Sequence, residues 1–142
     1  MRLSKWIPLL LLAALAGCAQ QPTRDAPARR ASAAVDYDKY VQRDVPWFRF
    51  TSLYSWDSNR LGSVVVWTGP AQAYLLSLAG SCIGLQNTFM IALTSQDGLV
   101  DSNRDYVIAG GDRCQIIRIQ TIDAKAIRAL RGKAKAGSDK GG

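Results

Sequence analysis

The segment Ser63-Val64-Val65-Val66-Trp67-Thr68 is dominated by β-branched and aromatic side chains and ends at Gly69-Pro70. Such side chains fit the pleated surface of a sheet, and a Gly-Pro pair marks a turn. The segment Ala73-Tyr74-Leu75-Leu76-Ser77-Leu78 follows closely and has the length and composition of a partner strand. We therefore expect an antiparallel hairpin over residues 63–78.

Further β-type segments flank this hairpin at short intervals. Upstream, the segment Trp47 to Trp56 predicts the first strand, and Asp57-Ser58-Asn59 provides a polar turn after it. Downstream, we expect strands at residues 89–94, 106–108 and 114–121; in the last, Ile117 and Ile119 alternate with polar residues. These segments predict a mainly β domain with about six short antiparallel strands in a small barrel or sandwich.

The periodicity changes after the last expected strand. Asp123 is a suitable N-cap, residues 124–131 favour a helix, and Gly132 is placed to stop it. Ile127 and Leu130 lie three residues apart, so they share a face that would plug one end of the barrel or sandwich. We therefore expect one short C-terminal helix, followed by a disordered basic tail at residues 132–142.

The N-terminal residues have the organisation of an export signal. Basic Arg2 and Lys5 precede an unbroken apolar run from Trp6 to Ala16, and small residues precede Cys18. The sequence Leu15-Ala16-Gly17-Cys18 resembles the lipobox of bacterial lipoproteins. The resemblance implies a signal peptide at residues 1–17 and a multiply acylated Cys18 as the mature N-terminus, which would anchor the chain stably to a membrane. The alternative is an ordinary cleaved signal peptide with an incidental cysteine.

The residues after Cys18 extend this prediction. In lipoproteins of this kind, a residue other than Asp after the lipidated cysteine implies the outer membrane, and here that residue is Ala19. Residues 18–45 predict a flexible tether, rich in Ala, Pro and Arg at its start, with a helical turn near residues 36–41. We therefore expect one folded domain, at residues 46–131, facing the periplasm of a bacterial cell envelope.

The composition argues against several kinds of active site. The chain has no His and no Glu, so its eleven acidic residues are all Asp. A Ser-His-Asp triad and a His-containing metal site are therefore excluded, and no general base with a pKa near neutrality is at hand. We predict no catalytic residue, no metal ligand and no cofactor, and we keep an enzyme that uses Asp and Tyr as a minor alternative.

The positive charge is concentrated at the C-terminus. The formal net charge is +7, yet residues 46–123 contain five Arg and six Asp, whereas residues 124–142 contain six basic residues and one Asp. This basic tail would either bind anionic lipid headgroups or simply be solvated, and we favour the second interpretation. The export signal argues against a nucleic-acid partner.

Two cysteines are left once Cys18 is assigned to the lipid anchor. Cys82 and Cys114 would lie in an oxidising compartment, where a cysteine pair in a small domain usually forms a disulfide. A redox-active pair is the alternative, but the chain lacks the Cys-x-x-Cys spacing that lowers a thiol pKa. We therefore predict a structural disulfide.

Other side chains have both a structural and a functional interpretation. The aromatic residues Trp47, Trp56, Trp67 and Tyr74 could stack on sugars or bases, but we expect them to form the core, with Trp56 the most exposed. The acidic run around Asp97, Asp101 and Asp105 resembles calcium-binding sequences, but it lacks the Gly and Glu of an EF-hand loop, so turn formation explains it better.

Several of these residues also form a family pattern. The pattern comprises Trp56, the segment 74–78, Cys82-x-Gly84-Leu85, Cys114-Gln115-Ile116 and Ile119. It resembles a proteobacterial lipoprotein domain of unknown function, number 6491. This resemblance implies a small secreted domain and brings no activity, cofactor or catalytic residue with it.

These observations predict a non-catalytic binding module, anchored to the membrane by lipid, that meets another envelope protein or the cell wall. The loop from Gly80 to Asn87 would form the contact, and we select Trp56, Ile83 and Leu85 as candidate partner-contact residues. An inhibitor or immunity-type lipoprotein and an envelope tether that uses the basic tail are the alternatives. The sequence does not indicate an oligomeric state.

Overall fold

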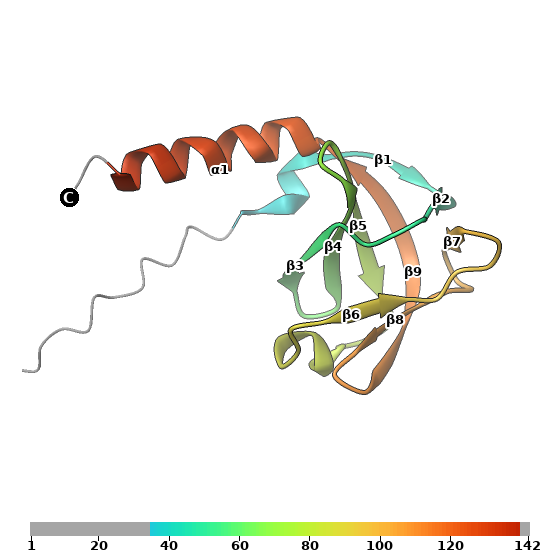
Figure 1. Cartoon of the computed structure of the whole chain (residues 1–142). Coiled ribbons are helices and arrows are strands. Elements are labelled where there is room, and N and C mark those ends of the chain that lie inside the picture. Colours follow the sequence, from blue (N-terminus) through green and yellow to red (C-terminus); the bar gives the residue numbers. More distant parts are fainter. Residues whose placement is uncertain (1–34, 140–142) are drawn as a thin grey trace, which may run out of the picture. The chain divides into compact units, whose positions relative to one another are not determined.

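The computed structural model describes residues 35–139 (Figure 1). The expected signal peptide, Cys18 and the first part of the tether lie outside the described residues. The elements are η1 (Tyr37–Tyr40), β1 (Val41–Val45), β2 (Trp47–Arg49), β3 (Ser55–Arg60), β4 (Ser63–Gly69), β5 (Gln72–Leu78), η2 (Ile83–Gln86), β6 (Ile91–Leu93), β7 (Leu99–Asp101), β8 (Tyr106–Ala109), β9 (Asp112–Ile122) and α1 (Ala124–Asp139). The predicted mainly β fold with a C-terminal helix is confirmed. Within the described residues, no helix combines the length and hydropathy needed to cross a membrane.

The main sheet is antiparallel and curls into a half-barrel. Its strand order is β3-β4-β5-β9-β8-β6, and β1 also pairs with β9. The long strand β9 makes this arrangement possible, because its first residues pair with β8 and its last residues pair with β1 (Figure 1). The short strands β2 and β7 form a separate two-stranded sheet.

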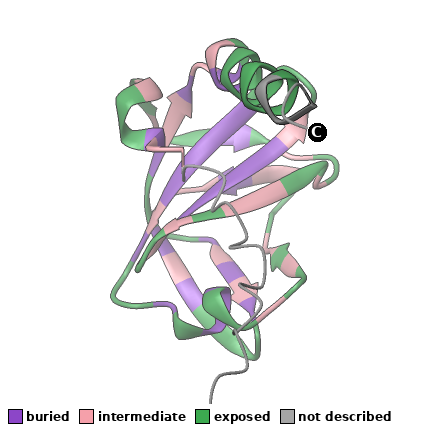
Figure 2. Cartoon of the chain, turned by 90° about the vertical axis from the view of Figure 1, so that its left-hand side faces the viewer, coloured by how far each residue is buried: buried purple, intermediate pink, exposed green. Residues whose placement is uncertain are grey.

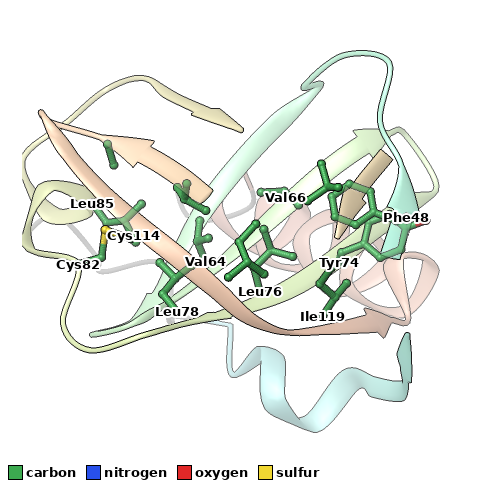
Figure 3. Packing of buried hydrophobic residues seen from close by; sticks show 14 residues of the cluster. Phe48, Val64, Val66, Tyr74, Leu76, Leu78, Cys82, Leu85, Cys114 and Ile119 are labelled. Carbon is green, nitrogen blue, oxygen red and sulfur yellow. A yellow bond between two sulfur atoms is a disulfide. The ribbon is translucent and has the colours of Figure 1, made fainter. Parts of the chain in front are cut away.

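The predicted hairpin is confirmed as β4 and β5, which pair from Ser63 and Ser77 to Gly69 and Gln72. Both of its faces are buried, which explains its unbroken apolar runs. One face turns toward the inside of the half-barrel, and its residues Val64, Val66, Tyr74, Leu76 and Leu78 join the larger core cluster (Figure 3). The other face, with Val65, Trp67, Ala73 and Leu75, packs against residues of η1, β9 and α1.

The burial of the second face depends on the C-terminal helix. Asp123 caps α1 as predicted, because its Oδ1 accepts a hydrogen bond from the Ala126 N–H at 2.9 Å. Ile127 is fully buried, whereas Leu130 is 41 % exposed, so the expectation that both plug the sheet is right only for Ile127. Figure 2 shows buried residues along the central strands and mostly exposed residues on the helix.

The folded domain begins before residue 46, which was its predicted N-terminal boundary. Residues 37–40 form the expected helical turn, but Val41 to Val45 are strand β1 and pair with Ile122 to Ile119 of β9. The segment Val-Gln-Arg-Asp-Val has little apolar character of its own, so β9 provides the backbone partner that makes it a strand. Within the described residues, the tether prediction is therefore wrong for 35–45.

The predicted first strand, Trp47 to Trp56, is also wrong as a single element. It is divided between β2, which pairs with β7, and β3, which pairs with β4. The predicted turn Asp57-Ser58-Asn59 lies inside β3, and the turn follows at Leu61-Gly62 instead. Pairing with the strongly β-forming β4 outweighs the turn preference of these polar residues.

Two further differences concern β9 and α1. The register of β9 against β5 shifts between Arg118 and Ile116, so Ile117 is the extra residue of a bulge and is 45 % exposed, unlike the buried Ile119. The helix α1 continues through Gly132 to Asp139, so the predicted disordered tail is helical over most of its length. Gly132 has no close neighbours, and a single exposed glycine lowers helix stability without ending the helix.

Candidate interaction surface

The segment between β5 and β6, residues 79–90, is held firmly against the sheet; we call it the apolar loop. It is the yellow-green segment that contains η2 in Figure 1. Cys82 and Cys114 form the predicted disulfide, with their Cα atoms 5.9 Å apart. This bond ties the loop to the start of β9 and lies at one end of the core, next to the buried Leu85 (Figure 3).

A glycine provides the second attachment of the loop. The Gly84 N–H donates a hydrogen bond to Asp112 Oδ2 at 2.8 Å. A Cβ atom at residue 84 would lie 1.9 Å from the backbone oxygen of Ala109, so only glycine fits this approach. The apolar loop is therefore fixed immediately before η2, at Cys82, and within η2, at Gly84.

The loop nevertheless exposes large apolar side chains. Ile83 is 62 % exposed, Met90 is 79 % exposed and Phe89 is 98 % exposed. Thr88 Oγ accepts from the Met90 N–H at 3.2 Å and donates to the Met90 carbonyl at 2.7 Å, which bends the chain at Phe89. Large exposed apolar groups of this kind are typical of interaction surfaces.

The three selected contact residues have different environments. Ile83 is exposed, as a contact residue must be, but Leu85 is only 4 % exposed and belongs to the core. Trp56 is half-buried and packs against the same core, and Trp47, at 48 %, is more exposed than Trp56. The choice of Leu85 and the exposure expected for Trp56 are therefore wrong.

Phe89 and Met90 are not among the predicted contact residues, because both belong to the segment 89–94 that was expected to form a strand. Strand β6 begins only at Ile91. Phe89 and Met90 therefore do not point to alternate faces of the sheet, an arrangement that would bury one of them. The polar pair Asn87-Thr88 is the signal in the sequence, since it favours a turn immediately before them.

Asp105 and Asp112, two of the acidic residues that a catalytic or metal site would use, already have structural partners. Asp105 is buried, and it accepts hydrogen bonds from Thr94 Oγ and from the Asp101 N–H, both at 2.8 Å. The carboxylate of Asp112 and the sulfur atoms of Cys82 and Cys114 lie within 4.8 Å of one another, but the sulfurs are bonded to each other and the carboxylate binds Gly84. This cluster attaches the loop and offers no thiolate to a metal.

A second polar cluster joins α1 to the outer face of the sheet. Arg131 donates to Asp57 Oδ2 at 2.7 Å and to the Tyr37 hydroxyl at 2.5 Å. The indole N–H of Trp67 donates to the same Asp57 oxygen at 3.1 Å. Burial, followed by the negative charge of Asp57, raises the pKa of Tyr37 to about 12. The cluster joins four elements, η1, β3, β4 and α1.

A cavity beside this cluster has a volume of about 160 Å³ and is lined by Tyr54, Ser55, Trp67, Pro70, Arg128 and Arg131. Its cationic groups are already engaged, because Arg131 pairs with Asp57 and Arg128 donates to the Pro70 carbonyl at 2.9 Å. The apolar loop is therefore the stronger candidate site.

The curled antiparallel sheet, the disulfide and the exposed loop define a small disulfide-linked β domain. The chain belongs to the family of unknown function DUF6491, whose model matches residues 1–138. The family resemblance predicted from the sequence is thus confirmed. Searches of the curated proteins and of the solved structures each returned no match.

Proposed function

We propose that this chain is a non-catalytic interaction module of the bacterial cell envelope. In this proposal, acylated Cys18 anchors it to the outer membrane and the β domain faces the periplasm. The lipobox pattern at Leu15 to Cys18 supports the anchor, and the disulfide between Cys82 and Cys114 fits an oxidising compartment.

One observation carries the binding role: the apolar loop exposes Ile83, Phe89 and Met90 while its backbone is attached to the rest of the domain at Cys82 and Gly84. A fixed loop loses little conformational entropy on binding, so its apolar side chains contribute more fully to affinity. Aromatic residues and Met are also enriched where proteins recognise one another. The partner that fits this surface is an envelope protein with an apolar pocket, and an inhibitor or immunity-type lipoprotein would act in the same way.

In-cell cross-linking of the full chain, followed by affinity capture, tests this role. The double variant Ile83→Ser, Phe89→Ser removes apolar surface without touching the core, and Leu61→Ser is the matched control because Leu61 is 65 % exposed on another turn. We expect one dominant partner with the wild type and the control, and at least about a tenfold loss with the double variant. Equal capture by all three proteins would refute the role of the loop.

The envelope tether is a second candidate, and the length of α1 favours it. Because the helix continues to Asp139, it presents Lys125, Arg128, Lys133 and Lys135 as exposed side chains on a regular scaffold. Such a helix would bind anionic headgroups in a salt-dependent manner. A chain truncated after Gly132 would then lose the salt-dependent association with anionic headgroups or the cell wall, whereas a loop-based module would keep its partner.

A further inference from the structure

Strand β6 is an open edge of the main sheet. Within residues 35–139, β8 is the only strand that pairs with it. The Thr94 N–H donates to the Tyr106 carbonyl at 2.9 Å, so Thr94 and, two residues earlier, Ala92 turn their backbone groups toward β8. By the alternation of an antiparallel ladder, the N–H and C=O groups of Ile91 and Leu93 point away from the sheet.

The opposite edge, β3, is protected by charge. Arg60 pairs with Asp36 at 3.3 Å and with Asp38 at 2.9 Å, and the Asn59 side chain donates to Asp38 at 3.4 Å. These contacts place residues of the N-terminal segment against β3. Charged side chains and covering segments are the usual means by which an edge avoids pairing with another chain.

Within the part of the chain that the structure describes, no ion pair involves β6. The sequence from Leu61 to Gln96 contains no charged residue, and β6 itself contains no proline. Ala92 is exposed in the middle of the strand, and the residues before it, Phe89 and Met90, are the two most exposed apolar side chains of the described domain. An uncharged edge with free backbone groups is a template for strand addition.

We propose that β6 pairs antiparallel with β6 of a second copy of this chain. A two-fold axis at Ala92 places Ile91 opposite Leu93 of the other copy, so the free backbone groups of both residues find partners. The edge is self-complementary, since pairing it with itself opposes no like charges and brings apolar residues to apolar residues. The second copy is therefore the occupant that the edge fits.

This inference goes beyond the proposed function. A three-residue strand buries little area, so the dimer is expected to be weak and to depend on concentration. Anchoring in one membrane would raise the local concentration of copies, and this step rests on the proposed lipid anchor. The dimer would present two apolar loops together and bind a repeated partner more tightly than one loop does.

Substituting Ala92 with residues of opposite charge tests the pairing in the full chain. The variants Ala92→Lys and Ala92→Asp each place like charges across the axis, and we expect each alone to dimerise roughly fivefold more weakly than the wild type. An equal mixture of the two variants should recover dimerisation as a Lys–Asp heterodimer. Ser58→Lys, on the protected β3 edge, is the matched control and should leave dimerisation unchanged.

The measurement is the dimer fraction against concentration, by analytical ultracentrifugation and by in-cell cross-linking, with circular dichroism to confirm folding. A monomeric wild type at all concentrations, or dimerisation unaffected by Ala92→Lys, would overturn the inference. A mixture that fails to recover dimerisation would also overturn it, because the copies would then meet elsewhere. Partner capture by a strictly monomeric chain would refute the dimer and leave the proposed function standing. A dimer that captures no partner would support the β6 pairing and refute the proposed function.

Discussion

At the residue scale, Gly84 has the strictest steric requirement in the apolar loop. Replacing Gly84 with Ala would place a methyl group 1.9 Å from the Ala109 carbonyl oxygen, and neither backbone segment can move without disturbing the disulfide-linked loop. We expect Gly84→Ala to lower the free energy of unfolding by about 2–4 kcal/mol. Urea unfolding measures this effect.

Gly69→Ala is the control for that measurement. Gly69 has an ordinary backbone conformation and open space around its Cα, so alanine should be tolerated within about 0.5 kcal/mol. Equal urea midpoints for the two variants would show that the close approach at Gly84 is not what fixes the loop.

Tyr37 gives the domain a specific response to alkaline pH. Its pKa is raised from 10.0 to about 12 in the folded state, first by burial and then by Asp57. The unfolded chain therefore releases this proton at lower pH, and the stabilisation is complete below pH 10 and lost as pH rises through about 12. In Tyr37→Phe, we expect the fall in unfolding free energy over this interval to be smaller by on the order of 1 kcal/mol.

Urea unfolding at several pH values between 8 and 12, the range set by about two units either side of the ordinary Tyr pKa, measures this difference. Tyr54→Phe is the control, because this variant also removes one tyrosine and Tyr54 is 65 % exposed. If wild type and Tyr37→Phe lost stability in parallel across this range, Tyr37 would not be the group responsible.

At the scale of elements, the disulfide determines how firmly η2 and the apolar loop are attached to β9. Cys82 and Cys114 are separated by 32 residues, and closing a loop of that size stabilises a fold by about 3–4 kcal/mol on the chain-entropy model. We expect the double variant Cys82→Ser, Cys114→Ser to lose this amount in urea unfolding. Reductant should lower the unfolding free energy of the wild type to that of the variant and leave the variant's value unchanged. A wild type that keeps its urea midpoint after complete reduction would contradict the prediction.

The elements that were predicted correctly are those whose signals are local. The β4–β5 hairpin follows from its β-branched run and its turn, and the start of α1 follows from the Asp123 cap. Strand β1 could not be predicted in this way, because its polar sequence becomes a strand only through pairing with β9, whose sequence is about 80 residues away.

The same distinction holds for the candidate site. The disulfide and the exposure of Ile83 were predictable, because two cysteines and a glycine-containing loop are visible in the sequence. The burial of Leu85 and the exposure of Phe89 were not, because they depend on the single turn of η2 and on where β6 begins to pair. Residue spacing alone assigns no face to so short a segment.

At the scale of the whole molecule, α1 has two halves with different roles. Its first half buries Ala124 and Ile127 on the outer face of the β4–β5 hairpin, and Arg131 fastens it to Tyr37 and Asp57. Apart from Asp139, the residues after Gly132 are basic or small, and they are exposed as far as Ala136. The first half is therefore part of the core, and the second half is available to the surroundings.

Two truncations of the full chain separate these roles. A chain that ends at Gly132 keeps Ile127 and Arg131, so its free energy of unfolding should match the wild type within about 0.5 kcal/mol. A chain that ends at Ile122 exposes Val65, Trp67 and Leu75, and we expect it to lose at least about 3–5 kcal/mol, comparable to deleting one large core side chain. Urea unfolding measures both values. Equal stability of the two truncated chains would mean that the outer face does not need the helix, and α1 would then serve the surroundings along its whole length.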